Sequence, residues 1–156
     1  MQSRLVRTNL VGTAAFLLAL MIAIPFKNER FAQFVIGVVS VVLFAVGIAT
    51  SLWAYTSALE RSRVDEVGVA NLYLLTGATA PKDVKRVMVG ALVVQVVAAL
   101  IGAFVGVVGL QDNEVNALAF GVLVPMFGIG MNGAWAARYG SYGPRVTAAG
   151  TSKKNG

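Results

Sequence analysis

The sequence contains no cysteine and no histidine. Without cysteine, the chain forms no disulfide, offers no thiolate to a metal and supplies no thiol nucleophile. Without histidine, it lacks the usual haem ligand, the commonest zinc ligand and the one side chain that titrates near neutrality when unperturbed. We therefore expect no metal and no cofactor.

Charged residues are scarce too. They make up 13% of the chain, about half the share in soluble domains, whereas hydrophobic residues make up 57%. The net charge of +6 comes from basic residues that flank apolar runs. This placement indicates contact with lipids, including anionic head groups, and we expect no nucleic-acid partner.

Four long apolar runs cover residues 10–26, 31–55, 87–110 and 115–137. Because about 20 such residues cross a bilayer and about 17 suffice, the runs predict an all-α integral membrane protein with four transmembrane helices. Short turns at 27–30 and 111–114 predict two antiparallel hairpins. The first run is longer than the apolar core of a signal peptide, and residues 25–30 contain no small-residue cleavage site, so we expect it to be retained.

By length the chain is a single domain. We expect a four-helix transmembrane domain over residues 1–147, with a loop at about 56–86 and a disordered tail at 148–156. The loop begins with charged residues, including Arg61 and Asp65, that we expect to be solvated. Its apolar residues, such as Leu72 and Leu75, predict a short segment lying at the membrane interface.

Basic residues are distributed very unevenly between the two sides of the predicted bundle. Eleven lie in the N-terminus, the long loop and the C-terminus, namely Arg4, Arg7, Arg61, Arg63, Lys82, Lys85, Arg86, Arg138, Arg145, Lys153 and Lys154. Only Lys27 and Arg30 lie on the other side. The positive-inside rule therefore predicts a multi-pass protein of the plasma (inner) membrane with cytoplasmic N- and C-termini.

None of the four runs contains Asp, Glu, Lys or Arg. A proton-coupled carrier normally needs an ionisable group at depth, and a membrane protease needs a nucleophile with its base. A head-group transferase needs clustered aspartates for its metal. Since the residues for each activity are missing, we expect the chain not to be an enzyme and assign no catalytic residue.

Small residues recur at helical spacing in the first and third runs. These candidate packing residues are Ala15, Ala19 and Ala23 in the first run, and Gln95, Ala98, Gly102 and Gly106 in the third. The spacing of Gly102 and Gly106 is the GxxxG pattern, which allows two helix backbones to approach closely. The pattern favours packing within the chain, and contact with a partner protein is the alternative.

The fourth run places Gly121, Pro125, Gly128, Asn132 and Trp135 along one helical face. Pro125 removes a backbone hydrogen bond and predicts a bent helix. The Asn132 amide can then bond a freed carbonyl or a neighbouring helix. A ligand contact is the alternative, but the sequence brings no second deep polar group to Asn132.

Aromatic and basic residues mark the predicted cytoplasmic interface. The candidate anchors are Trp53, Tyr55, Lys82, Lys85, Arg86, Trp135, Arg138 and Tyr139. Trp and Tyr gather at head-group level because one part of each ring system is apolar and another is polar.

The Ala/Val/Gly-rich spans and the stretches LLTGATAPKDVKR (74–86) and FGVLVPMFGIGMNGAWAARYG (120–140) resemble small four-span membrane proteins of actinobacteria. The resemblance implies an accessory subunit of a Mce-type lipid import complex, or else a supernumerary subunit of a respiratory complex. A larger membrane protein complex is then the expected partner. From the residues alone, a non-catalytic accessory or scaffolding subunit and a small oligomeric transporter or channel both remain open.

The predicted topology is testable by cysteine labelling. A cysteine introduced at Asn28 or Asn113 should react with an impermeant maleimide added to intact cells, because both positions fall in turns on the side with few basic residues. A cysteine at Ser152 should be protected until the cells are opened. The reverse labelling pattern would rule out this topology.

Overall fold

The computed structural model describes residues 2–63, 65–108 and 115–144, and within them the regular structure is helical apart from one isolated bridge between Asp65 and Pro144. The elements are α1 (Gln2–Ala23), α2 (Arg30–Arg61), α3 (Val69–Tyr73), α4 (Lys82–Val107), the 3-10 helix η1 (Ala117–Leu123) and α5 (Pro125–Tyr139).

Four stretches are long and apolar enough to cross a membrane: Arg4–Ala23, Arg30–Arg61, Lys82–Val107 and Ala117–Tyr139. They confirm the predicted all-α class and the four candidate spans. The predicted turn at 111–114 and the predicted tail at 148–156 lie outside the described residues.

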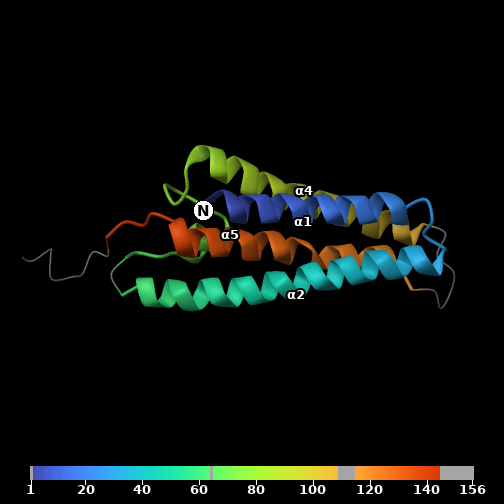
Figure 1. Cartoon of the computed structure of the whole chain (residues 1–156), viewed down its shortest axis with the longest axis horizontal. Helices are drawn as coiled ribbons and strands as arrows, with labels where there is room; N and C mark the ends of the chain where they lie inside the picture. The colour runs from blue at the N-terminus through green and yellow to red at the C-terminus, as the bar shows by residue number, and fades with distance from the viewer. Residues whose placement is uncertain (1, 64, 109–114, 145–156) are drawn as a thin grey trace, which may run out of the picture.

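The long helices run alongside one another in an elongated bundle (Figure 1). In this view α1 and α4 lie on one side of α5, and α2 lies on its other side. The start of α1, the loop that follows α2 and the end of α5 gather at one end of the bundle, and the turn between α1 and α2 lies at the opposite end. Both described ends of the chain therefore lie at the same end of the bundle.

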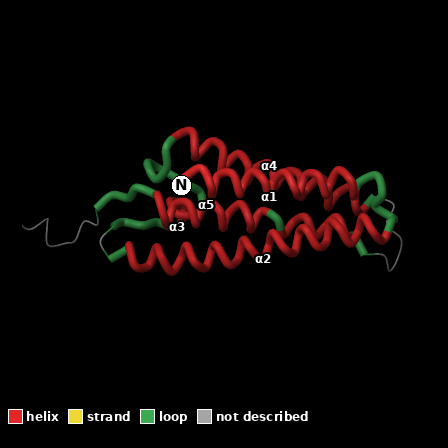
Figure 2. Tube along the Cα trace, viewed as in Figure 1, coloured by secondary structure: helices red, strands yellow, loops and turns green. Residues whose placement is uncertain are grey.

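The fourth span is interrupted rather than simply bent. The sequence predicted one continuous helix with a bend at Pro125, but the structure has a 3-10 helix that ends at Leu123 and an α-helix that begins at Pro125. Figure 2 shows the interruption as a short non-helical segment between the two parts. Proline is suited to the first position of a helix, because its φ angle is already helical and its missing N–H would have no helical partner there.

Helix α5 is enclosed by the rest of the bundle. Ten of its 15 residues are buried, and α1, α2, α3 and α4 all contact it. Helix α2 is different: at about 1.5 Å per residue its 32 residues extend about 48 Å, well beyond a hydrocarbon core of about 30 Å. The extra length carries the end of α2 past the end of α5.

The backbones of α2 and α5 approach each other closely. The side of α2 that meets α5 carries small residues at helical spacing, namely Gly47, Ser51, Ala54 and Ala58, all of them buried. A Cβ atom added to Gly47 would lie 2.5 Å from backbone atoms of Met126, and one added to Gly130 would contact the carbonyl oxygen of Gly47. The sequence pattern indicated the small residues of the first and third spans as packing residues and did not indicate this pair.

Replacing Gly47 with alanine should destabilise the bundle, because the new methyl group would overlap backbone that cannot move aside cheaply. Overpacking of this kind costs about 1–3 kcal/mol. The measurement is the free energy of unfolding in mixed detergent micelles.

Gly37→Ala is the matched control for this substitution. It lies on the same helix, and a Cβ added there meets no atom within 4 Å. Alanine favours helix over glycine, so this variant should be as stable as the parent or slightly more so. Equal losses from Gly47→Ala and Gly37→Ala would contradict the close contact.

Candidate functional site

Three spans meet at a buried polar cluster beside the interruption in the fourth span. Its members are Asn9 and Thr13 of α1, Gln95 of α4 and the backbone N–H of Gly128 in α5. Asn9 is 1% exposed, Thr13 6% and Gln95 0%, so the cluster is closed off from both water and lipid. We take it as the candidate site because it is the place where deep polar groups from different spans converge.

The cluster satisfies a backbone group that the start of α5 leaves without a helical partner. The carbonyl oxygen of Val124, which would accept from Gly128 in a regular α-helix, accepts from the Phe127 N–H at 2.8 Å. The Gly128 N–H instead donates to Gln95 Oε1 at 3.1 Å. In a hydrocarbon environment an unsatisfied N–H costs several kcal/mol, so a side chain from another helix completes the helix start.

Both ends of the Gln95 amide are used. Its Nε2 donates to Thr13 Oγ1 at 2.7 Å and, over a longer distance of 3.4 Å, to Asn9 Oδ1. The Thr13 hydroxyl in turn donates to the carbonyl of Asn9 at 2.8 Å. One side chain of α4 therefore connects α1 to α5.

The hydrogen bond between Gln95 and the α5 backbone needs the space that a glycine leaves at position 128. A Cβ atom at this position would lie 2.5 Å from Gln95 Oε1 and 3.0 Å from Leu92 Cδ1. The sequence singled out both Gln95 and Gly128 but gave no indication that they touch. It missed Asn9 and Thr13, whose i, i+4 spacing on the face that also carries Phe16 and Leu20 was the available signal.

Asn132 makes a second buried connection, one turn further along α5. Its Nδ2 donates to the carbonyl of Tyr73 at 3.1 Å, and the Tyr73 hydroxyl donates to the carbonyl of Ser51 at 3.0 Å. Burial raises the pKa of Tyr73, so the hydroxyl stays protonated and able to donate near neutral pH. The chain of contacts joins α5, α3 and α2, which favours the helix-contact interpretation of Asn132 over the ligand one.

Arg61 holds the other end of α5. Its guanidinium donates to the carbonyls of Ala137 and Gly140, each at 3.1 Å, pairs with Asp65 at 3.4 Å and stacks over the Tyr142 ring at 4.9 Å. A cation at the end of a helix satisfies free carbonyls and interacts favourably with the helix dipole. Of the charged residues expected to be solvated here, Glu60, Arg63 and Glu66 are exposed, whereas Arg61 and Asp65 are half-buried by these contacts.

The loop segment packs against the bundle on one side: Leu72 and Leu75 are buried in a cluster with Met88 and Trp135. Val69 and Leu74 of the same segment are 70% and 47% exposed. Leu75 has a φ of 52° and Gly77 a φ of 64°, so the chain reverses sharply between α3 and α4.

The predicted packing stripes face inward, with one exception. Buried positions are Ala19, Ala23, Gln95, Ala98, Gly102 and Gly106. A Cβ on Gly102 would approach Leu20, and one on Gly106 would overlap the Asn116 amide, so Gly102 and Gly106 pack against other parts of the same chain. Ala15 is exposed, and its predicted part in this packing was wrong.

The predicted membrane anchors divide into two groups. Trp53 and Tyr55 are 46% and 48% exposed, as an interfacial position requires. Among the basic anchors, the exposed residues are Lys82, Arg86 and Arg138, and Lys85 is half-buried. Trp135 was assigned wrongly: it is completely buried in the core. Tyr139 is half-buried against it, with the ring centroids 5.8 Å apart. The spacing that placed Trp135 near the end of the span did not reveal that α3 covers it.

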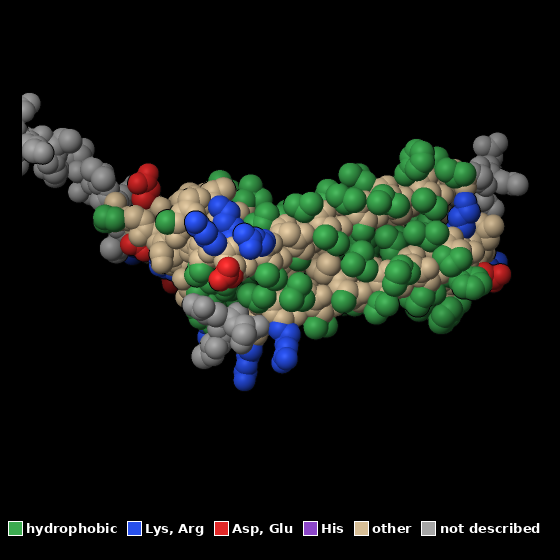
Figure 3. Space-filling view, turned by 90° about the horizontal axis from the view of Figure 1, so that it is seen from above, with side chains coloured by type: hydrophobic (Ala, Val, Ile, Leu, Met, Phe, Trp, Pro, Cys, Tyr) green, Lys and Arg blue, Asp and Glu red, His purple; other side chains and the backbone are tan. Residues whose placement is uncertain are grey.

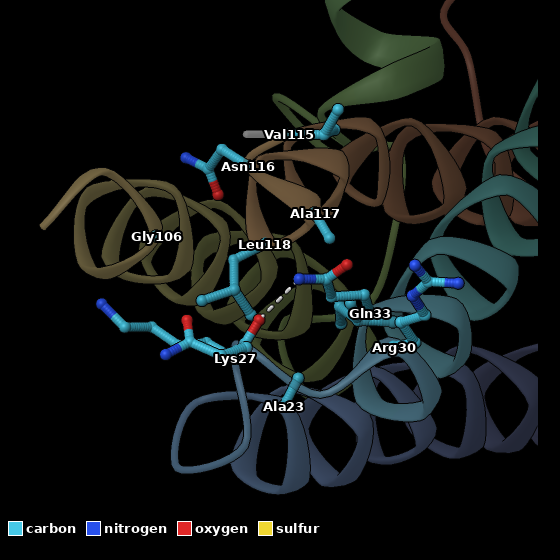
Figure 4. A pocket seen from close by; sticks show the side chains of 11 residues that line it. Ala23, Lys27, Arg30, Gln33, Gly106, Val115, Asn116, Ala117 and Leu118 are labelled. Atoms are coloured by element: carbon cyan, nitrogen blue, oxygen red, sulfur yellow. Dashed lines mark hydrogen bonds between the residues drawn. The ribbon is translucent and has the colours of Figure 1, made fainter. Parts of the chain in front are cut away.

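The end of the bundle formed by the α1–α2 turn holds a pocket of about 370 Å³ (Figure 4). Several of its polar groups bond to backbone. Gln33 Nε2 donates to the carbonyl of Lys27 at 2.9 Å, the Lys27 ammonium donates to the carbonyl of Val108, and Asn116 Nδ2 donates to that of Ala103 at 3.0 Å. These bonds connect the α1–α2 turn to α2 and to the end of α4, and the start of η1 to α4.

Known proteins offer no guide to this site. No protein-family model matches the chain, and neither a curated protein nor a solved structure is similar to it. Within the parts of the chain that the structure describes, no three His, Cys, Asp or Glu residues come together as a metal site would require. The chemistry that the polar cluster can perform is hydrogen bonding between helices.

Replacing Gln95 with methionine should lower the free energy of unfolding by about 1–3 kcal/mol, because the substitution keeps the volume but leaves the Gly128 N–H without its acceptor and removes the hydrogen bond that Thr13 Oγ1 accepts. Unfolding in mixed micelles measures the loss. The control is Val97→Met on the same helix, where the side chain is 49% exposed and a small effect is expected. If the two variants are equally stable, the cluster does not hold the spans together.

Proposed function

We propose that the chain is a non-catalytic accessory or scaffolding subunit that packs against a larger membrane complex of the cell envelope. It crosses the plasma (inner) membrane four times as two antiparallel hairpins, with both termini in the cytoplasm. The resemblance to small actinobacterial membrane proteins favours a lipid transport system as the complex. Anionic lipids are its second class of partner.

The observation that carries the proposal is how the deep polar groups are used. Gln95 Oε1 accepts from the start of α5, Asn132 connects α5 to α3, and the Thr13 hydroxyl oxygen accepts a hydrogen bond from Gln95 Nε2. A binding site or transport path needs polar groups that turn toward a ligand or a channel. Here the polar groups hold the helices to one another, as they would in a subunit whose role is structural.

The outer surface supports the same proposal. Large apolar side chains are strongly exposed on several spans, among them Phe31 and Phe34 of α2 and Phe104 of α4, which are 76%, 68% and 74% exposed. Such a surface needs lipid or another membrane protein around it. A supernumerary subunit of a respiratory complex would present the same surface, and the identity of the co-purifying subunits separates the two.

A small oligomeric transporter or channel is the second candidate. Two buried amide atoms favour it: Asn9 Nδ2 and Asn132 Oδ1 have no hydrogen-bond partner among the described residues. Polar atoms left free at depth are what a transported substrate would bond. Both atoms are enclosed in the single chain, so a transporter of this kind would have to open its helices.

Purification of the chain at its natural level in a mild detergent tests the proposal. We expect the 16.3 kDa chain to migrate with a much larger assembly whose subunits recur in fixed ratio, including those of a lipid import complex. Migration of the chain by itself, together with substrate or ion flux from the purified protein in liposomes, would contradict the proposal and favour the transporter.

Asn132→Ala separates the two candidates within one variant. As a helix contact, Asn132 should contribute about 0.6–2 kcal/mol to stability, the range for one interhelical hydrogen bond in a membrane. The variant should therefore unfold more easily and retain less of the partner complex. Unchanged stability combined with lost flux would instead identify Asn132 as a ligand group.

A further inference from the structure

The first three turns of α4 present one face that changes from basic to apolar. The residues along it are Lys82, Lys85, Arg86, Val89, Gly90 and Val93, and they line a shallow surface groove of about 500 Å³. Their spacing of three or four residues places them in a row along the helix. Figure 3 views the molecule from the α4 side, with Lys and Arg side chains gathered toward one end and hydrophobic side chains over much of the remaining surface.

The three cations are available to a ligand. Lys82 and Arg86 are exposed and Lys85 is half-buried. The one ion pair within the described residues joins Arg61 and Asp65, so Asp83, which lies next to the groove, neutralises none of the three by direct contact. The basic end of the groove therefore attracts an anion.

Gly90 opens a notch in the groove just beyond the cations. A Cβ added at Gly90 would meet no atom within 4 Å, so the internal packing of the protein does not require glycine there. The open space at Gly90 belongs to the groove that Val89 and Val93 also line. Further along the same row, Val97 is 49% exposed and Leu100 60% exposed, so the apolar surface continues without cover.

We propose that this groove binds one anionic glycerophospholipid. Its phosphate lies against Lys82, Lys85 and Arg86, and one acyl chain passes through the notch at Gly90 and along Val93 and Val97. The rise from Arg86 to Val97 is about 16 Å, close to half of a hydrocarbon core of about 30 Å, which is the depth of a single leaflet. The inference rests on the membrane-spanning part of the proposed function and does not depend on the accessory role.

Native mass spectrometry of the purified chain tests the site, with phosphatidylglycerol and phosphatidylcholine of identical acyl chains as probes. The parent should retain one phosphatidylglycerol in preference to phosphatidylcholine by about tenfold, since basic residues near anionic lipid each contribute to binding. The combined variant Lys82→Gln, Lys85→Gln and Arg86→Gln should lose this preference. Retention of both lipids to the same extent by the parent would overturn the proposal.

Gly90→Leu tests the notch separately from the charges. It leaves all three cations in place and fills the space beside Val93, so retention of phosphatidylglycerol should fall about as far as in the charge variant. Gly37→Leu on α2 is the matched control, because it too adds a side chain where no atom lies within 4 Å, and it should retain the lipid.

Unchanged thermal stability of Gly90→Leu and Gly37→Leu shows that both are folded when the lipids are compared. If Gly90→Leu binds like the parent while the charge variant does not, the lipid is held by a general basic patch and the groove is not its site. Neither result depends on co-purification with a partner, so the lipid site and the accessory role can fail independently.

Discussion

The hydrogen bond from the Gly128 N–H to the Gln95 side chain is the contact on which the arrangement of the spans depends. The fourth span is interrupted at Pro125, and an interruption within a membrane is tolerated only where neighbouring groups satisfy the freed backbone. Gln95 supplies that group from α4 and is itself positioned by Thr13 and Asn9 of α1. Removing this one amide leaves unpaired groups on both α1 and α5.

The remaining polar contacts extend the same arrangement along α5. Arg61 satisfies carbonyls at its end, and Asn132 connects its middle to α3. Small residues at Gly47 and Gly130 bring α2 against its other side. A helix held at its start, middle and end by other elements is suited to a rigid structural subunit, which is why we favour an accessory role over a transport cycle that would need these contacts to open.

The sequence was sufficient for the features that depend on composition and length. Four apolar runs predicted the four candidate spans, and the spacing of Ala19, Ala98 and Gly102 predicted their inward faces.

The sequence was insufficient for features that depend on contacts between distant parts of the chain. Trp135 near a span end looked like an anchor, because the burial supplied by α3 cannot be read from the span itself. Arg61 in a charged stretch looked solvated, because the C-terminal carbonyls of α5 lie more than 70 residues further along the chain. Gln95 was recognised as a packing residue, but its partners are distant in sequence.

A double-mutant cycle between Thr13 and Gln95 tests the central claim most directly. The free energy of unfolding is measured in mixed micelles for the parent, Thr13→Val, Gln95→Met and the double variant. If the buried amide connects α1 to α5 as described, the two substitutions should be coupled by about 0.6–1.7 kcal/mol, the range for hydrogen bonds between membrane helices. Losses that add to within about 0.3 kcal/mol would show that the two side chains act independently and would contradict the account.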